Sequence, residues 1–462
     1  MTGEPFSSAK GAPSLGSLFA LAWPIVLTRA TQSVIGFADA LMVAPLGEDV
    51  LAAVTTGALN CFAFIILPMG TVFILQSFAA QLRGRGEVAR LPRYGWYGLV
   101  LALFFGLASL IAVPFVPALV GLFPYAPAVE AHLSDYLVIR LLSVGAAVGS
   151  EALGNWYGGL GNTRVGMIGS LVAMSVDLLG NYLLIEPRFG LPGYGVKGAA
   201  WASTIGSFVG FAVLAYAFGR GMGYERRPGA LGLNLKELGR VLRFGLPNGV
   251  NWFLEFAAFV LFINAVVGHL GTTVLAAFNV VMQVNSISFM PAFGLSSAGA
   301  ILVGEAIGRR EHDKVWPIVK LTGAVASVWM LSVGMIYFVV PEALIALFKP
   351  REGDALALIA VGSTMLMLSA LWQLADAVQL ALSEALRAAG DTAWCMGARL
   401  VLAWVVFTPV AWAAVLLLDG GVYTVMAAMI AYIVVLAATF AARFASGRWR
   451  QIDLVGAEPN LL

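Results

Sequence analysis

Five carboxylic acids interrupt segments of the chain that are otherwise almost entirely apolar. They are Asp39, Glu151, Asp177, Glu255 and Asp376. An ionised acid at the centre of a membrane-spanning helix costs about 2.5–3.5 kcal/mol on insertion, so each one needs a partner, a proton or a water-filled cavity. Such residues mark ion and substrate pathways in membrane proteins. The five acids are therefore the first candidates for a functional site.

In the C-terminal half, polar residues accompany the acids at helical spacing. The three stripes are Asn248, Asn251 and Glu255; Asn279, Gln283 and Ser286; and Ser369, Gln373, Asp376, Gln379 and Ser383. Residues three or four apart share one helix face, so these faces are expected to meet each other or water. Interhelical hydrogen bonds explain the amides and hydroxyls. No lysine or arginine lies deep in these three segments, so a shared proton or a bound cation is expected to compensate the two acids.

The N-terminal half carries a second polar group. Its members are Asp39, Glu151, Asn155, Asp177, Asn181, Ser203 and Thr204. Carboxylate, amide and hydroxyl oxygens are the ligands that small hard cations prefer. Arg29 and Arg140 lie deep in the same half, and the alternative is that they neutralise two of the acids as structural ion pairs.

The composition defines the class of protein. Of 462 residues, 60% are hydrophobic and 11% are charged, against about 25% charged in an ordinary soluble domain. The chain is predicted to be a polytopic membrane protein whose surroundings are the lipid bilayer. The net charge of +2 predicts no nucleic-acid partner, and Cys61 and Cys395 supply neither a disulfide framework nor a metal site. From the first sixteen residues, which lack a charged region followed by an apolar core, we expect no cleaved signal peptide.

Apolar segments long enough to cross a bilayer, about 20 residues each, recur along the chain. We predict twelve spans, at 17–44, 50–81, 95–121, 129–158, 165–185, 197–219, 244–268, 272–305, 315–341, 355–386, 394–418 and 421–445. The fold class is therefore all-α, with an N-terminal segment 1–16, an N-lobe 17–219, a linker 220–243, a C-lobe 244–445 and a tail 446–462.

Basic residues orient these spans. Most lie in the N-terminus, in the loops after even-numbered spans and in the tail, among them Lys10, Arg226 and Arg227, whereas the opposite face has only Arg188, Lys197, Lys349 and Arg351. Because positive loops stay cytoplasmic, both termini are expected in the cytoplasm, with the chain in the plasma (inner) membrane.

The two halves of the sequence are duplicated. LGEDVLAA at 46–53 returns as LGTTVLAA at 270–277, and Pro24 of AWP returns as Pro247 of GLP. Six spans per repeat predict two lobes related by a pseudo-twofold axis along the membrane normal, an arrangement typical of transporters. The acids are not copies of one another, because Glu255 corresponds to Thr31 or Gln32. Two unequal polar sites suit a protein that couples two bound species.

Several segments resemble the hallmark sequences of the multidrug and toxic compound extrusion family. They are GFADALMV, LGEDVLAA, GLGNTR, NYLLI, GVKGAAWAST, FMPAFGLSSAGAILVGEAIG and SEALRAAGDT, in order over roughly 17–440. The resemblance implies two six-helix lobes, export of organic cations or related amphiphiles, and coupling to sodium ions or protons. It implies no other cofactor.

Acids in spans one, seven and ten, here Asp39, Glu255 and Asp376, resemble the NorM-type subclass. The family's N-lobe cation site maps onto Asp39, Asp177, Asn181 and Ser203, with Asn155 as a further candidate. This chain departs from the family pattern, which usually has Asn first in span five and Thr in span six. For the C-lobe ion or substrate site we expect Glu255, Asp376, Asn251, Gln283 and Gln373, with sodium at Asp39 or at the Glu255 and Asp376 pair.

We expect the protein to act as a monomer and to export small organic cations by antiport. Aromatic faces attract cations, so Trp252, Phe256, Phe259 and Trp372 are expected to line the substrate site, although ordinary packing is the alternative for each. The rivals are a lipid-linked flippase or a dedicated exporter of one metabolite with the same fold, a channel, and a membrane enzyme. Hydrolase, metalloprotease and phosphate-loop motifs are absent from the sequence, so no enzymatic activity is predicted.

Overall fold

The computed structural model describes residues 14–123, 125–188, 190, 192–224, 233–348 and 355–456. Contacts divide the described chain into two units, the first holding 23–224 and 233–249 and the second 14–22 and 250–456. The basic residues Lys10, Arg226, Arg227, Lys349 and Arg351, on which part of the predicted orientation rests, lie outside the described residues. The predicted lobe and linker boundaries, and the twofold axis, stay predictions.

Helices make up the first unit, as a lipid environment requires, because only internally paired backbone is stable in hydrocarbon. They are α1 (Leu15–Val43), α2 (Glu48–Phe73), α3 (Leu75–Arg85), α4 (Leu91–Ala112), α5 (Val116–Val120), α6 (Pro127–Leu141), α7 (Val144–Gly159), α8 (Thr163–Leu184) and α9 (Gly195–Arg220), with 3-10 turns at Ala44–Leu46, Val88–Arg90 and Val113–Phe115. The first part of α1 belongs to the second unit.

The second unit is built in the same way. Its helices are α10 (Leu235–Phe262), α11 (Thr272–Gly308), α12 (His312–Val339), α13 (Pro341–Ala346), α14 (Ala355–Ser369), α15 (Gln373–Ala389), α16 (Thr392–Leu400), α17 (Thr408–Leu416) and α18 (Val422–Ala445), with π-helical Ile263–Val267 and Val401–Phe407 and 3-10 turns at Gly268–Leu270, Ala370–Trp372 and Arg448–Gln451. Helix α10 begins in the first unit, which extends to Gly249.

The predicted number of spans is confirmed. In the described residues, eleven helical segments are long and apolar enough to cross a membrane, and a bent pair makes a twelfth. That pair, α6 and α7, corresponds to the predicted span 129–158, which is bent by 47° rather than straight. At the bend, Ser143 Oγ donates to the carbonyl of Arg140 at 2.8 Å. A serine that bonds back to a helical carbonyl competes with the helix ladder and accompanies bends.

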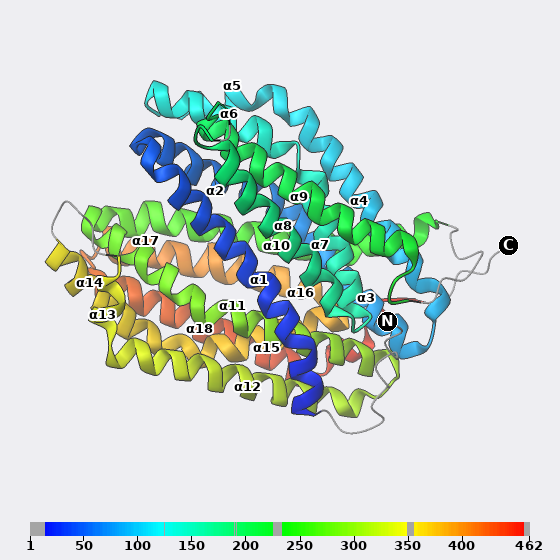
Figure 1. The fold of residues 1–462 in the computed structure, drawn as a ribbon. Coiled ribbons are helices and arrows are strands. Elements are labelled where there is room, and N and C mark those ends of the chain that lie inside the picture. The colour runs from blue at the N-terminus through cyan, green and yellow to red at the C-terminus, as the bar shows by residue number, and fades with distance from the viewer. Residues whose placement is uncertain are drawn as a thin grey trace. The chain divides into compact units, whose positions relative to one another are not determined.

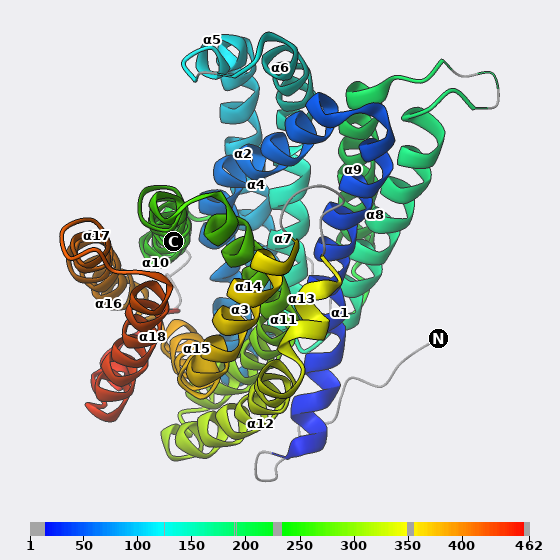
Figure 2. The same ribbon diagram turned by 90° about the vertical axis from the view of Figure 1, so that its left-hand side faces the viewer.

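Small residues let α8 and α9 pack closely in the first unit (Figure 2). A Cβ added to Gly206 would lie 3.1 Å from Asp177 Cβ, and one added to Gly180 would lie 2.9 Å from Ala202 Cβ. Small residues allow membrane helices to approach in this way. The consequence is that the acid of α8 lies directly against the backbone of α9.

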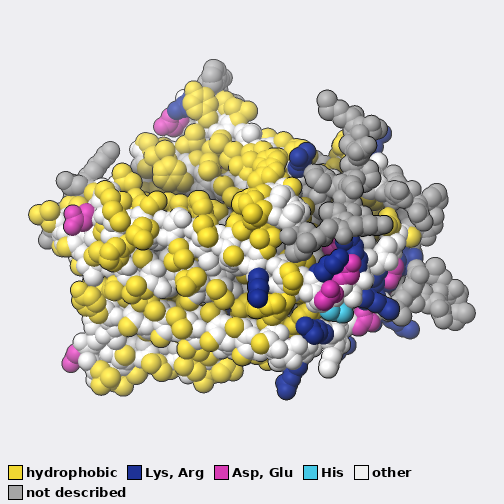
Figure 3. Space-filling model, turned by 90° about the horizontal axis from the view of Figure 1, so that it is seen from below, with side chains coloured by type: hydrophobic (Ala, Val, Ile, Leu, Met, Phe, Trp, Pro, Cys, Tyr) yellow, Lys and Arg dark blue, Asp and Glu magenta, His cyan; other side chains and the backbone are white. Residues whose placement is uncertain are grey.

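In the second unit, α11, α12 and α15 pack against one another, and α15 also packs against α18 (Figure 1). A buried hydrophobic cluster of this unit includes Phe262, Phe278, Tyr337, Trp372 and Phe407. On the face shown in Figure 3, hydrophobic side chains cover most of the visible surface, and charged side chains gather toward one end. This distribution is that of a chain whose sides face lipid.

Candidate ion and substrate sites

Asn181 joins two acids in the first unit. Its Nδ2 donates to Asp39 Oδ1 at 2.5 Å and to Asp177 Oδ2 at 3.3 Å. Ser203 Oγ donates to Asp39 Oδ2 at 3.2 Å. Three helices, α1, α8 and α9, thus bring together the four residues that the family resemblance implies, and all four are buried.

Two acceptor oxygens of this group are left over. Asp177 Oδ1 and Asn181 Oδ1 are buried and have no hydrogen-bond partner among the described residues. An unpaired buried acceptor is costly, and a bound cation or a proton would relieve both oxygens. The group of Asp39, Asp177, Asn181 and Ser203, which we call the N-site, therefore has the chemistry of a site for a small cation.

Arg140 is the positively charged residue whose charge acts on both acids of the N-site. Its Nη1 donates to Ser143 Oγ at 3.2 Å, and its charge acts on Asp39 and Asp177 at longer range. Two carboxylates and one guanidinium carry a net charge of −1 when all are ionised. The N-site is therefore incompletely neutralised by protein charges, which favours one more positive charge.

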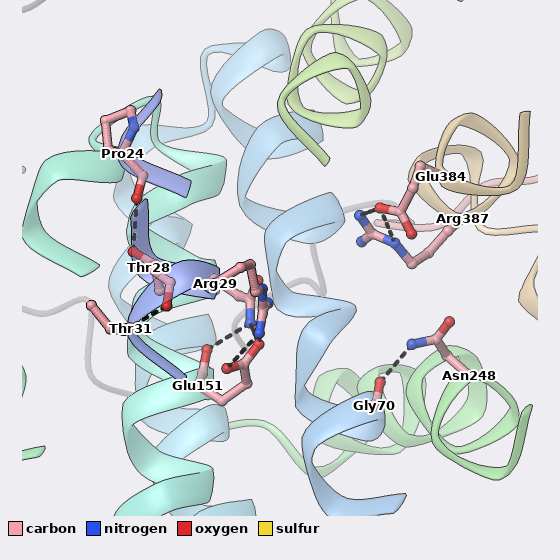
Figure 4. Close-up of polar contacts among 10 residues, drawn as sticks. Pro24, Thr28, Arg29, Thr31, Gly70, Glu151, Asn248, Glu384 and Arg387 are labelled. Atoms are coloured by element: carbon pink, nitrogen blue, oxygen red, sulfur yellow. Dashed lines mark hydrogen bonds and ion pairs between the residues drawn. The ribbon is translucent and has the colours of Figure 1, made fainter. Parts of the chain in front are cut away.

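Arg29 and Glu151 form a separate, buried ion pair (Figure 4). Arg29 Nη2 lies 2.8 Å from Glu151 Oε1, and Asn155 Nδ2 donates to the same oxygen at 2.8 Å. The structural alternative stated for Glu151 is thus the one that the geometry supports. The structure does not bring Asn155 into the N-site, because its amide is committed to Glu151.

Glu255 is not an uncompensated acid, which corrects the sequence prediction. Its Oε2 accepts a hydrogen bond from Arg399 Nη1, where α10 faces α16. The prediction considered basic residues in spans seven, eight and ten, whereas Arg399 lies in span eleven. The available signal was the single arginine within the apolar segment 394–418.

Asp376 is half-buried on α15, within the electrostatic reach of both Glu255 and Arg399. The three side chains form the C-site, a second cluster of two carboxylates and one arginine. Asn251 is buried on the same helix as Glu255, and its Oδ1 has no partner among the described residues. Asn248, one turn earlier, donates to the carbonyl of Gly70 at 2.7 Å (Figure 4) and so serves packing within the first unit.

The amide network of the second unit uses Asn285 rather than the predicted Gln283. Gln283 is exposed, whereas Asn285 is buried, accepts from Gln373 Nε2 at 2.8 Å and donates to Ser369 Oγ at 3.1 Å. Gln373 is fully buried, and its Oε1 has no partner among the described residues. Gln373 therefore belongs to a connection between α11 and α15, and the structure does not bring Gln283 to it.

The predicted substrate aromatics fall into two groups. Trp372 is buried in the hydrophobic cluster of the second unit, and Phe259 packs against that cluster and against Phe278. Trp252 and Phe256 are half-buried beside Glu255 on α10, and Trp252 contacts Phe293 edge to face. Packing, the alternative stated for each ring, therefore accounts for Trp372 and Phe259.

Buried carboxylates held by amides and arginines on apolar helices are typical of ion and substrate pathways in membrane proteins. The model of the MatE family matches residues 24–183 and 249–413. The chain belongs to this family, the multidrug and toxic compound extrusion family that its motifs resemble.

Named relatives and solved structures agree with this membership. The chain is 26% identical to the multidrug resistance protein NorM of Burkholderia vietnamiensis over 80% of this chain and 81% of that one. It is also 26% identical to a probable NorM of Thermotoga maritima, over 94% and 93%. Among solved structures, a MOP superfamily transporter from Pyrococcus furiosus has a TM-score of 0.86 at 18% identity, over 94% of this chain and 96% of that one. An outward-facing multidrug resistance MATE transporter has the same TM-score, identity and coverage.

Proposed function

We propose that the chain is a secondary active antiporter that exports organic cations or amphipathic drugs and metabolites from the cytoplasm. The export is driven by sodium ions or protons that enter through alternating access of the two lobes in the plasma (inner) membrane. The observation that carries the proposal is the pair of unpaired buried oxygens, Asp177 Oδ1 and Asn181 Oδ1, beside Asp39. The relatives named as multidrug resistance proteins support the class of cargo.

In this proposal the N-site takes the coupling ion. The site offers two carboxylates, one amide oxygen and one hydroxyl, which are ligands suited to sodium, and either carboxylate can accept a proton instead. Ion binding changes the balance of conformations only if the two conformations differ in affinity for the ion. Neutralisation of the N-site then favours the cytoplasm-facing conformation, in which the protein takes up new cargo.

The cargo is assigned to the C-site. Glu255 and Asp376 provide negative charge, and the half-buried rings of Trp252 and Phe256 provide apolar surface next to it. Cationic amphiphiles combine a positive charge with apolar rings, and both parts are matched by such a site. A dedicated exporter of one metabolite would use the same arrangement with a narrower pocket.

Exchange in proteoliposomes tests the proposal. The purified chain is reconstituted, a sodium gradient or a pH gradient is imposed separately, and efflux of a small panel of organic cations is followed. We expect saturable efflux with one gradient and its loss in Asp39→Asn. The matched control is Asp135→Asn, because Asp135 pairs with Lys197 at 3.3 Å on the exposed surface of the same unit. Non-saturating flux without any ion gradient would indicate a channel and would refute the antiporter.

A further inference from the structure

The ion pair between Glu255 and Arg399 joins two side chains of very different exposure. The arginine side chain is 11% exposed and the glutamate side chain is 43% exposed. Arg399 therefore neutralises Glu255 from the protein side, while the other side of the carboxylate stays open. A soluble or amphipathic cation can reach Glu255, but it has to compete with a guanidinium that is already there.

The surroundings of Arg399 hold it in place without consuming its hydrogen-bonding capacity. Its guanidinium lies 5.4 Å from the centre of the Phe440 ring, and its Nε has no hydrogen-bond partner among the described residues. Trp404, one turn further on, donates to the carbonyl of Leu254 at 3.1 Å and so ties this part of the chain to α10 beside Glu255. The ring contact with Phe440 and the hydrogen bond of Trp404 to the Leu254 carbonyl therefore hold Arg399 in position.

Arg399 also has other acceptors within its electrostatic reach. The hydroxyl of Tyr432 is buried and unpartnered among the described residues, and it responds to the charges of Arg399, Glu255 and Asp376. Asp376 is half-buried and responds to Arg399 as well. A guanidinium carries several donors in a rigid fork, and besides Glu255 it has Tyr432 and Asp376 as acidic or acceptor groups in its electrostatic surroundings.

The helix that carries Arg399 is irregular at this point. A π-helical segment, Val401–Phe407, begins two residues after it, and a second one, Ile263–Val267, ends the helix that carries Glu255. π-Helical segments are rare, and those that occur are often found at functional sites. Both partners of the ion pair are therefore carried by helices with an uncommon local geometry.

These observations fix the charge of the C-site. With all three groups ionised, Glu255, Asp376 and Arg399 sum to −1, which one monovalent cation balances. We propose that Arg399 is the charge-selectivity residue of the C-site. It holds Glu255 neutralised, so that Asp376 binds a monocation, and a dication binds only by displacing Arg399 from Glu255. This inference rests on the proposed function, since it concerns the cargo of the same site.

Binding of two cations to the purified full-length chain tests it. Dissociation constants are measured for tetraphenylphosphonium, a monocation, and methyl viologen, a dication, in wild type, Arg399→Gln, Arg399→Lys, Glu255→Gln and Arg399→Gln/Glu255→Gln. Arg399→Gln removes the internal positive charge. It is expected to raise the ratio of dication affinity to monocation affinity about tenfold relative to wild type, because Glu255 becomes available as a second carboxylate near a protein surface. Arg399→Lys keeps the charge and is expected to keep the preference. The double variant keeps the net charge of −1 through Asp376 and is expected to keep it too, whereas Glu255→Gln has a net charge of 0 and is expected to bind both cations more weakly.

A matched control separates charge selectivity from folding. Arg443→Gln removes another arginine of the second unit, one that is paired with Asp391 at 2.7 Å, and it is expected to leave the preference unchanged. If folded Arg399→Gln binds both cations with the wild-type preference, or if Arg399→Lys shifts it equally, the selectivity role is wrong while the antiporter stands. If wild type binds neither cation and shows no exchange, both proposals fail.

Discussion

Asn181 donates its one amide group to the carboxylates of both Asp39 and Asp177. The two acids belong to helices far apart in sequence, α1 and α8, and neither touches an arginine of the described chain within ion-pair distance. A neutral amide supplies two donors but no charge. The N-site is thus connected by hydrogen bonds while it keeps its negative charge, which is the condition for binding and releasing an ion.

Replacing the Asn181 amide by a carboxylate tests its role in the N-site. Asn181→Asp adds a third acid and removes both donated hydrogen bonds, so we expect stronger repulsion within the empty site and a loss of ion-driven efflux. Asn181→Gln keeps the amide and is expected to retain part of the activity. Efflux rates at several sodium concentrations and pH values measure the difference. Wild-type efflux in Asn181→Asp would contradict the role of the N-site.

The pair of Arg29 and Glu151 is expected to act on stability rather than on transport coupling. Removing one partner of a buried pair costs about 3–5 kcal/mol, because the other charge is left uncompensated. Glu151→Gln is therefore expected to lower the melting temperature in detergent. Replacing both residues, as in Arg29→Met/Glu151→Leu, is expected to recover most of that loss. If the double variant is stable but its efflux no longer responds to any ion gradient, the pair is part of the coupling machinery instead.

Helix α10 contains two glycines with opposite expected behaviour. A Cβ on Gly249 would lie 2.3 Å from both the carbonyl oxygen of Leu67 and Thr71 Oγ1, whereas nothing lies within 4 Å of one on Gly239. Gly249→Ala is expected to force α10 away from α2 and to destabilise the protein by about 1–3 kcal/mol, as overpacking does. Gly239→Ala is the matched control and is expected to be neutral or to stabilise by up to about 1 kcal/mol through helix propensity. Thermal unfolding in detergent compares the two, and equal effects would exclude the packing explanation.

The amide connection between α11 and α15 gives a further test. Asn285→Ala removes the shorter of the two acceptors of fully buried Gln373 Nε2 and leaves only the Ser369 carbonyl at 3.5 Å. A poorly satisfied buried donor is expected to cost about 1–3 kcal/mol. Gln283→Ala changes an exposed amide of the same helix and is expected to have a negligible effect on the melting temperature. A larger loss for Gln283→Ala than for Asn285→Ala would show that the predicted stripe, rather than the observed network, holds these helices together.

Local patterns in the sequence determined the spans and the membership of the family. Apolar length places eleven of the segments directly and the twelfth as the bent pair α6 and α7, because a helix needs about 20 apolar residues to cross the hydrocarbon core. The family motifs also implied Asp39, Asp177, Asn181 and Ser203, and the structure brings these four together.

Tertiary structure decided which residues are partners. Helical spacing predicted a polar face with Gln283, but which face is buried depends on how α11 packs against α15. The structure exposes Gln283 and buries Asn285 instead. In the same way, the sequence contains Arg399 without indicating that α16 lies beside α10. An ion pair between helices far apart in the chain has no local signature, because its energy comes from a contact that exists only after packing. For that reason the sequence alone left Glu255 as an unpaired acid, and the fold made it half of a charge pair.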